Sequence, residues 1–335
     1  MKAAIYAGQG GPVRIETLPD PVPGPGDVVI RVHRCGICGT DLAMTRGGPW
    51  DYGTDSQFGH EFAGEVVALG RDVTDLRLGD RIAVLPSVSC GTCATCEAHG
   101  NNVLCRNSDD VLTGGFAEFA RLPVRNATRL PASLSMADGA LIEPLAIALY
   151  GLRRAGIVPG ERVLVLGSGA VAAYAIYWAR RMGAGRIAAM SRSARRADLV
   201  RLMGADALVP FGPDEAGEID AALEGAPTLV LECVGAEGML GKAIQHAAPF
   251  ARLVSLGFCM APDPVLPAVA AYKCLSLHFS VGYTMREFIE IAHAMDKGHC
   301  DPKASITATV PLDDLPATLE RLRGTHDETK VHVAT

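Results

Sequence analysis

An alternation of apolar strands, glycine turns and alanine-rich helices over residues 147–279 constrains the fold of this chain more than any other feature. Apolar runs such as RVLVLG and TLVLECVG end in glycine, and helical stretches such as AVAAYAIYWARRMG intervene. Buried strands that alternate with helices form a parallel sheet with helices on both faces. We therefore expect an α/β protein in which this segment is a doubly wound parallel sheet.

The flanking segments have a different residue pattern and predict a second domain. Residues 1–146 are rich in Gly, Pro and short β-branched runs such as DVVIRVHR, a pattern typical of strands between tight turns. Residues 280–335 contain two amphipathic helical stretches. A chain of 335 residues also exceeds what one hydrophobic core usually serves. We predict a β-rich domain of residues 1–146 and 280–335, and an α/β domain of residues 147–279.

Charge and hydropathy exclude several classes of protein. A net charge of −6 without a long basic run argues against nucleic acid or an anionic membrane as the main partner. The longest uncharged run, residues 163–179, is too short and too interrupted by glycine for the ~20 residues of a membrane span. The start, MKAAIYAGQG, lacks the apolar stretch of a secretory signal. We expect a cytoplasmic protein whose cysteines are thiols or metal ligands.

A glycine motif in the alternating half predicts a dinucleotide site. VLVLGSGAVAA places Gly167 and Gly169 directly after a predicted strand, with Ala172 in the third position of the dinucleotide-binding pattern. Ordinary tight turns also match such a triplet, but this one lies between a strand and a helix with further such units behind it. It lets the backbone approach a pyrophosphate at the helix N-terminus. We predict that Gly167, Gly169, Ala170 and Val171 bind a nicotinamide cofactor.

The end of the second predicted strand indicates which cofactor. NAD-binding chains usually carry an acidic residue there, whereas NADP-binding chains place arginine nearby. Counting back from the LMGAD turn puts Ser191 at that position, followed by Arg192, Arg195 and Arg196. Guanidinium groups suit a 2′-phosphate, although solvated arginines at a helix N-terminus are the alternative interpretation. We predict NADP, with NAD as the alternative, and Ser191, Arg192 and Arg196 as contacts.

Two groups of residues have metal-ligand character. CGTCATCEAHGNNVLC contains four cysteines whose spacing suits a closed, structural zinc site, with four reduced thiols as the alternative: Cys90, Cys93, Cys96 and Cys105. The second group comprises the cysteines of RCGICGTDLA, the His and Glu of FGHEFAGE and the Glu of LIEPLA. Catalytic zinc takes about three protein ligands and keeps one position open. Taken one at a time, these residues do not indicate a metal site. The two cysteines by themselves could be a redox pair, a pair of metal ligands, or one ligand and one cysteine without a role at the metal.

Six segments together resemble the medium-chain dehydrogenase/reductase superfamily, in its zinc-dependent alcohol and polyol dehydrogenase branch: GICGTD, GHEFAGEV, the four-cysteine segment, IEPLA, VLVLGSGAV and the closing KVHV. The resemblance implies a GroES-like catalytic domain, a Rossmann-type dinucleotide-binding domain and two zinc ions per chain. It implies that Cys38 is a catalytic ligand and Cys35 is not. His60 and Glu143 complete the implied ligand set, and Glu61 could exchange with Glu143 or with water.

The resemblance also assigns roles around these ligands, with two departures. Thr40 resembles the hydroxyl that accepts the substrate proton, unless it merely satisfies a turn, and Lys330 in KVHV is expected among the cofactor contacts. Many relatives carry a histidine three residues after that hydroxyl, where this chain has Ala43. The four-cysteine segment is one residue longer than usual before Cys105, and His99 lies in the insertion. We prefer Cys105 over His99 as the fourth ligand.

The predicted function is hydride transfer between a secondary alcohol or vicinal diol, or the ketone, and NADP. Zinc acts as a Lewis acid that lowers the pKa of the alcohol oxygen. The alternatives are a zinc-free quinone or enoyl reductase of the same fold and a non-enzymatic zinc module that binds a partner. The expected partners are a small-molecule alcohol or ketone and further copies of the chain, in a homodimer or homotetramer.

Overall fold

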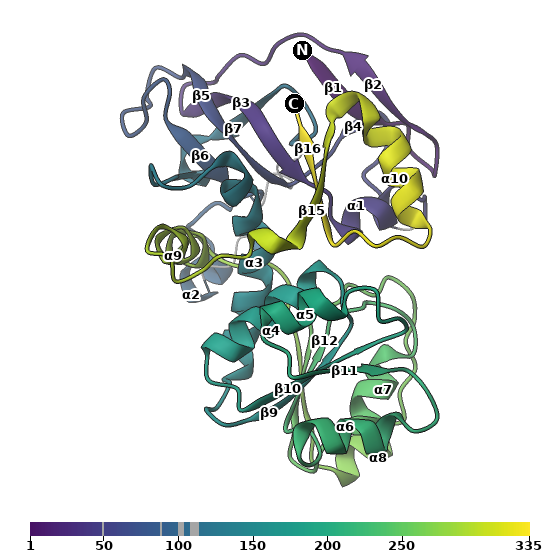
Figure 1. Cartoon of the computed structure of the whole chain (residues 1–335). Coiled ribbons are helices and arrows are strands. Elements are labelled where there is room, and N and C mark those ends of the chain that lie inside the picture. Colours follow the sequence, from purple (N-terminus) through teal and green to yellow (C-terminus); the bar gives the residue numbers. More distant parts are fainter. Residues whose placement is uncertain (49, 88, 100–103, 108–113) are drawn as a thin grey trace. The chain divides into compact units, whose positions relative to one another are not determined.

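The computed structural model of the chain describes residues 1–48, 50–87, 89–99, 104–107 and 114–335 (Figure 1). It divides into two compact units, Met1–Glu143 with Tyr283–Thr335, and Pro144–Gly282. The predicted boundaries lie within three residues of these, at 146 against 143 and at 280 against 283. Within the described ranges, no helix combines the length and the apolar character needed to cross a membrane.

The first unit is β-rich, which confirms the fold expected for this part of the chain. Among its described residues the strands pair in two sheets, and four α-helices lie wholly within this unit. The strands are β1 Lys2–Tyr6, β2 Val13–Thr17, β3 Asp27–Gly36, β4 Ser56–Gln57, β5 Glu61–Leu69, β6 Arg81–Val84, β7 Phe119–Pro123, β8 Ala127–Arg129, β15 Ile306–Pro311 and β16 Lys330–Ala334. The helices are α1 Gly39–Met44, α2 Ala94–His99, α9 Met285–Asp296 and α10 Leu315–Arg323.

Strands from both ends of the chain build the larger sheet of this unit. Its order is β15-β16-β3-β5-β6-β8, with β7 also paired to β3, while β2-β1-β4 form the smaller sheet. The C-terminal strand β16 pairs with β3 through His332 and Gly36. Buried aromatic rings fill the core, and the rings of Phe58 and Phe116 meet edge to face at 5.1 Å. The sheet therefore brings the end of the chain beside the segment that carries the first cysteine motif.

The second unit has the predicted doubly wound parallel sheet. Its strands are β9 Arg162–Leu166, β10 Arg186–Ser191, β11 Ala207–Pro210, β12 Leu229–Glu232, β13 Arg252–Ser255 and β14 Ser276–Phe279. Its helices are α4 Ala170–Arg181, α5 Ala197–Met203, α6 Glu215–Leu223, α7 Met239–His246 and α8 Pro267–Tyr272; helix α3, Met136–Ala155, begins in the first unit and ends in this one. On one face of the sheet, Leu164, Met190 and Val230 share a core with Ile219 of α6 and Ile244 of α7.

The order of the strands fixes where a ligand can bind to this sheet. The order β11-β10-β9-β12-β13-β14 is, in chain order, third-second-first-fourth-fifth-sixth, the arrangement of the Rossmann fold. The order reverses between the neighbours β9 and β12. Ligands of such sheets bind at this reversal, beyond the carboxyl ends of the strands. The predicted glycine motif follows β9 directly and therefore lies at the expected place.

Candidate active site

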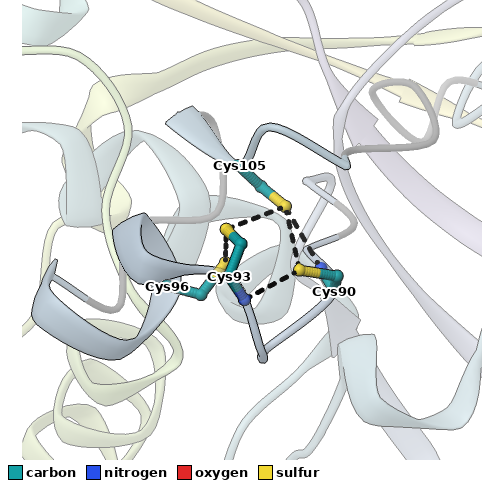
Figure 2. Close-up of side chains that lie close together, drawn as sticks. All are labelled: Cys90, Cys93, Cys96 and Cys105. Atoms are coloured by element: carbon teal, nitrogen blue, oxygen red, sulfur yellow. Dashed lines mark hydrogen bonds between the residues drawn. The ribbon is translucent and has the colours of Figure 1, made fainter.

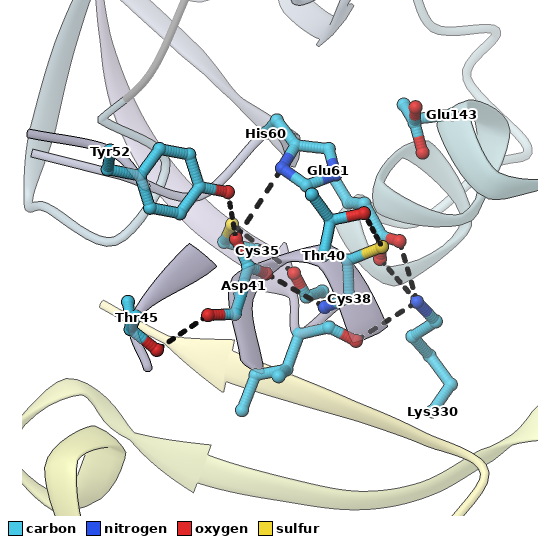
Figure 3. Close-up of polar contacts among 12 residues, drawn as sticks. Cys35, Cys38, Thr40, Asp41, Thr45, Tyr52, His60, Glu61, Glu143 and Lys330 are labelled. Atoms are coloured by element: carbon cyan, nitrogen blue, oxygen red, sulfur yellow. Dashed lines mark hydrogen bonds and ion pairs between the residues drawn. The ribbon is translucent and has the colours of Figure 1, made fainter. Parts of the chain in front are cut away.

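Two motifs that are separate in the sequence meet where β3 ends and β5 begins. The antiparallel register pairs Gly36 with Glu61, so the residues just beyond each strand end come together. Cys38 follows β3 as the N-cap of α1, and His60 immediately precedes β5. The ligand atoms of Cys38, His60 and Glu61 all lie within 4.8 Å of one another (Figure 3). The structure thus gathers a thiol, an imidazole and a carboxylate, three donor types that zinc prefers.

The backbone before His60 requires glycine. Gly59 has φ +93°, in the left-handed region that L side chains rarely adopt. A Cβ at this position would also lie 2.6 Å from Cδ2 of Phe116. The chain therefore turns tightly over the aromatic core and delivers the imidazole to the cluster.

A buried carboxylate links the two motifs. One Asp41 oxygen accepts the backbone N–H of Cys38 at 2.8 Å, and the other lies 3.5 Å from Nδ1 of His60. The hydroxyl of Tyr52 donates to that second oxygen at 2.7 Å. Burial lowers the pKa of His60, but the Asp41 carboxylate and Cys38 outweigh it, so that the pKa stands well above its usual value. A carboxylate placed this way orients a histidine that ligates a metal.

Cys35 lies outside this cluster. It is the fully buried residue of β3 that pairs with Phe62, and its sulfur lies 3.7 Å from the carbonyl oxygen of Gly36. Burial, followed by the nearby Asp41 and Glu61 charges, raises the pKa of its thiol well above the usual value. An inert, protonated thiol is the expected state of such a cysteine.

The two candidate carboxylate ligands have different partners. Lys330 donates to both oxygens of Glu61, at 2.7 and 2.6 Å. Glu143 instead accepts a hydrogen bond from the hydroxyl of Tyr283 and is absent from the cluster that Glu61 joins among the described residues. Burial raises the pKa of Glu143 to about 7. The predicted role of Lys330 as a cofactor contact stays a prediction.

The predicted proton acceptor lies beside the cluster. The hydroxyl oxygen of Thr40 is 3.6 Å from the sulfur of Cys38, within the first turn of α1. Its role in proton transfer stays a prediction. Ala43 lies in the last turn of the same short helix and offers no titratable group.

The four cysteines of the second motif converge around one point (Figure 2). Neighbouring sulfur atoms are 3.5 to 3.9 Å apart, in the pairs Cys93–Cys96, Cys90–Cys105 and Cys93–Cys105. A tetrahedron with zinc–sulfur bonds of about 2.3 Å has edges of about 3.8 Å. Disulfides have a much shorter separation of about 2 Å. The spacing therefore fits four thiolates around a single zinc ion.

The surroundings of these sulfur atoms favour negative charge. The backbone N–H groups of Cys90 and Cys93 each point at a sulfur atom, at 3.3 Å. Hydrogen bonds from Thr92 lower the pKa of Cys90 to about 6, whereas burial and the neighbouring thiols raise that of Cys96 to about 11. A negatively charged sulfur atom makes it harder for its neighbours to lose their protons. A bound metal cation offsets this repulsion and so favours the thiolate form of the cysteines. The side chain of His99, the alternative ligand, lies outside the described residues.

The glycine motif of the second unit has the geometry of a dinucleotide-binding turn. Gly167 has φ +119° and donates its N–H to the carbonyl of Met190 at 2.7 Å. Gly169 is the N-cap of α4, which begins at Ala170, and a Cβ at Gly169 would meet no atom within 4 Å. Backbone N–H groups at this helix end are therefore accessible to a phosphate.

The end of β10 carries the residues predicted to select the cofactor. The hydroxyls of Ser168 and Ser191 are 2.9 Å apart, which ties the glycine turn to the last residue of β10. Arg192 and Arg195 follow on the exposed surface, and Arg196 is the N-cap of α5. No acidic side chain occurs among residues 191–196.

Three site residues were not predicted from the sequence. Asp41 had a detectable signal, because an acid three residues after the N-cap Cys38 has the spacing of a capping box. Tyr52 and Tyr283 had none, since each meets its carboxylate only through the tertiary fold.

The fold and the site together define a class of protein. A GroES-like unit with a thiol, imidazole and carboxylate cluster, joined to a Rossmann-type unit, is the arrangement of metal-dependent, dinucleotide-linked oxidoreductases.

Comparisons with known proteins identify the family. The profile of the alcohol dehydrogenase GroES-like domain matches residues 24–132, and that of the zinc-binding dehydrogenases matches residues 170–297. Sorbitol dehydrogenase from Gallus gallus is 30% identical over 286 residues, 80% of this chain and 78% of that protein. A solved zinc-binding dehydrogenase from Sinorhizobium meliloti 1021, bound to NADP, is 29% identical with a TM-score of 0.87, covering 100% and 99% of the two chains. The 2R,3R-butanediol dehydrogenase from Bacillus subtilis is 28% identical with a TM-score of 0.88 at the same coverage.

The chain belongs to the medium-chain dehydrogenase/reductase superfamily, in its zinc-dependent alcohol and polyol dehydrogenase branch. It is an NAD(P)-dependent oxidoreductase, which confirms the predicted class of enzyme. A non-enzymatic zinc module, one of the alternatives, is therefore wrong.

Proposed function

We propose that this enzyme transfers a hydride between a secondary hydroxyl group of a polyol or vicinal diol and NADP, with a catalytic zinc held by Cys38, His60 and one carboxylate. The convergence of thiol, imidazole and carboxylate within 4.8 Å carries the proposal. The donor set fits zinc, and a site with about three protein ligands keeps a position for substrate. The relatives named sorbitol dehydrogenase and 2R,3R-butanediol dehydrogenase support a substrate with more than one hydroxyl group.

Different residues of the chain hold the metal and transfer the proton. Zinc, when bound, supplies Lewis-acid polarisation of the substrate oxygen. Asp41 holds the imidazole of His60 in one orientation and caps the backbone at Cys38. Thr40, close to Cys38, relays the proton of the substrate hydroxyl: its oxygen accepts this proton while its own hydroxyl proton passes on toward solvent. Ala43 takes no part in its onward transfer, because it has no group that can carry a proton.

The preference for NADP rests on the residues after β10. Ser191 offers a hydroxyl where NAD-binding chains place a carboxylate, and Arg192 and Arg196 supply guanidinium groups for a 2′-phosphate. The NADP-bound relative from Sinorhizobium meliloti supports this choice.

A second zinc ion, bound by Cys90, Cys93, Cys96 and Cys105, braces the segment that carries them. The support is the sulfur spacing described above and the N–H groups directed at the sulfur atoms. This gives two zinc ions per chain. The homodimeric or homotetrameric assembly and the cytoplasmic location stay predictions.

A panel assay tests the proposed function. Polyols, vicinal diols, simple primary alcohols and the matching ketones are offered to the zinc-loaded protein with each cofactor, and its metal content is measured alongside. We expect turnover of a polyol or vicinal diol with NADP, and loss of that turnover when a chelator removes zinc. Equal turnover after complete zinc removal would contradict the proposal, as would activity confined to simple primary alcohols.

A further inference from the structure

The side chain of Arg323 connects the last helix of the first unit to the short helix beside the proposed metal site. Arg323 is the last residue of α10, and its side chain is 15% exposed. One terminal nitrogen of the guanidinium group donates to the backbone carbonyl of Leu42 in α1. The other donates to the hydroxyl of Thr45 at 2.7 Å and to its carbonyl at 3.3 Å. The contact with Leu42 thus joins residues that are 281 positions apart in the chain.

Helix α1 depends on contacts of this kind, because its own sequence gives it little stability. It has six residues, whereas isolated helices of fewer than about 12 residues are marginal in water. The last carbonyls of a helix have no partner within it, and the last turn of α1 carries no basic residue. Arg323 supplies both the missing donors and a positive charge at this end. It therefore caps α1 from a different helix.

Helix α10 holds the guanidinium group firmly in place. Leu315, Leu319 and Leu322 of this helix are buried in the core of the first unit. The carboxylate of Glu320, one turn before Arg323, accepts a hydrogen bond from Nε at 3.0 Å. The two remaining guanidinium nitrogens therefore stay directed toward α1.

The contact reaches the proposed metal ligands through Thr45 and Asp41, which are both buried. The hydroxyl of Thr45 accepts from Arg323 and donates to the backbone carbonyl of Asp41 at 2.6 Å (Figure 3). The carboxylate of Asp41 in turn accepts the backbone N–H of Cys38 and faces Nδ1 of His60. Displacement of the C-terminal end of α1 would therefore displace the carboxylate that orients both proposed ligands.

We propose that Arg323 is a positioning residue for the reaction, which caps α1 from α10 and so fixes Asp41 and Thr40 at the metal site. This inference rests on the proposed function, because it presumes a metal at Cys38 and His60 and a proton relay at Thr40. Arg323 acts through α1. Its removal should loosen this helix, weaken metal binding and slow turnover while the fold persists.

The direct test measures amide hydrogen exchange over residues 38–46 in the whole chain as purified, since such exchange reports local opening of a helix. Wild type is compared with Arg323→Gln, which keeps a polar side chain but loses the charge and the forked donor. Arg321→Gln is the matched control, because it makes the same charge change on the same helix and its ion-pair partner is Glu328. We expect exchange to quicken by about tenfold or more in Arg323→Gln alone, with exchange in β5 unchanged.

Metal affinity and kinetics distinguish positioning from a general effect on stability. A chelator competes for the zinc whose loss tracks the loss of turnover, and we expect its affinity to fall by about tenfold in Arg323→Gln. We expect kcat to fall with little change in KM, because Thr40 acts on the proton in the transition state. Arg323→Lys restores the charge but not the fork, so it should recover part of each loss.

A second variant keeps the test valid if Arg323→Gln folds poorly. Thr45→Val keeps the size of the side chain but removes the hydroxyl between Arg323 and Asp41. It should quicken exchange over residues 38–46 and lower zinc affinity in the same direction. Because both changes break one connection, the double variant should differ little from Arg323→Gln.

Unchanged exchange over residues 38–46 in both Arg323→Gln and Thr45→Val would overturn the inference. Faster exchange spread evenly over the first unit, with unchanged zinc affinity and kcat, would also overturn it, because Arg323 would then only stabilise the fold. A wild-type protein that binds no zinc at Cys38 and His60 would instead overturn the proposed function. The exchange measurement does not depend on zinc and would still report whether Arg323 holds α1.

Discussion

The buried carboxylate of Asp41 lies 3.5 Å from Nδ1 of His60, and its other oxygen caps the backbone N–H of Cys38. One side chain therefore fixes both proposed ligands relative to each other. Because α1 is only six residues long, this contact rather than the helix itself defines the position of Cys38.

Replacing Asp41 with Asn should weaken zinc binding without unfolding the protein. The amide keeps the size of the side chain but loses the charge that orients the imidazole, and loss of such a partner typically costs about 10–100-fold in metal affinity. Competition with a chelator of known affinity measures the change. Tyr52→Phe removes only the hydroxyl that contacts Asp41 and should have a smaller effect. Equal affinities in wild type and Asp41→Asn would show that the carboxylate does not support the site.

Replacing Cys93 with Ser should lower stability before it affects the chemistry. Metal binding to a closed four-thiolate site contributes to the folding free energy, so a lost ligand destabilises the segment that it braces. Thermal unfolding measures this, with exposed Cys274→Ser as the control. A Cys93→Ser protein with an unchanged Tm but no turnover would assign these cysteines to catalysis instead.

Replacing Arg192 with Ala should weaken NADP binding by about one to two orders of magnitude, because a hydrogen bond to a charged group contributes roughly 1.5–3 kcal/mol. Binding of NAD, which lacks the 2′-phosphate, should change little. Titration of both cofactors at matched salt measures this, with Arg201→Ala as a control of equal charge change. Wild type that binds NAD at least as tightly as NADP would refute the predicted preference.

The buried histidine of β16 should make stability depend on pH. His332 is fully buried, and within the described residues neither ring nitrogen has a hydrogen-bond partner. Burial, with smaller contributions from Lys330 and Arg34, lowers its pKa to about 3. In the unfolded chain His332 has its usual pKa of about 6.5, so it binds a proton at a higher pH there than in the folded protein. The neutral, buried His332 therefore costs no stability above pH 6.5, and the folded protein loses stability as the pH falls from 6.5 toward 3.

Through this histidine, acidification from pH 7 to pH 5 should lower the free energy of unfolding by about 2 kcal/mol. Urea unfolding of wild type and His332→Leu at both pH values measures it. The variant should show the smaller loss on acidification. Parallel pH dependences in the two proteins would mean that His332 is not buried in its neutral form.

The sequence was sufficient to predict the fold because burial patterns are local. The strand, glycine and helix alternation identified the parallel sheet, and Gly167 marked the turn at its switch point. The cysteine spacing likewise predicted a group of thiols that the structure brings together.

The partners of the two carboxylates could not be predicted, because they depend on the tertiary fold. Tyr283 is 140 residues from Glu143, and Lys330 is 269 residues from Glu61. The resemblance to the family suggested a cofactor contact for Lys330. Its contact with Glu61 follows only from the register of β16, β3 and β5, which no local pattern specifies.

The measurement that tests the central claim most directly is the zinc content and NADP-linked turnover of Cys38→Ser beside wild type. Wild type should contain about two zinc ions per chain, one from each proposed site. The variant should lose one zinc ion and its turnover, while it still folds and binds cofactor, because Cys38 holds the open site and does not stabilise the core. A zinc-depleted Cys38→Ser protein that turns over at the wild-type rate would contradict the account.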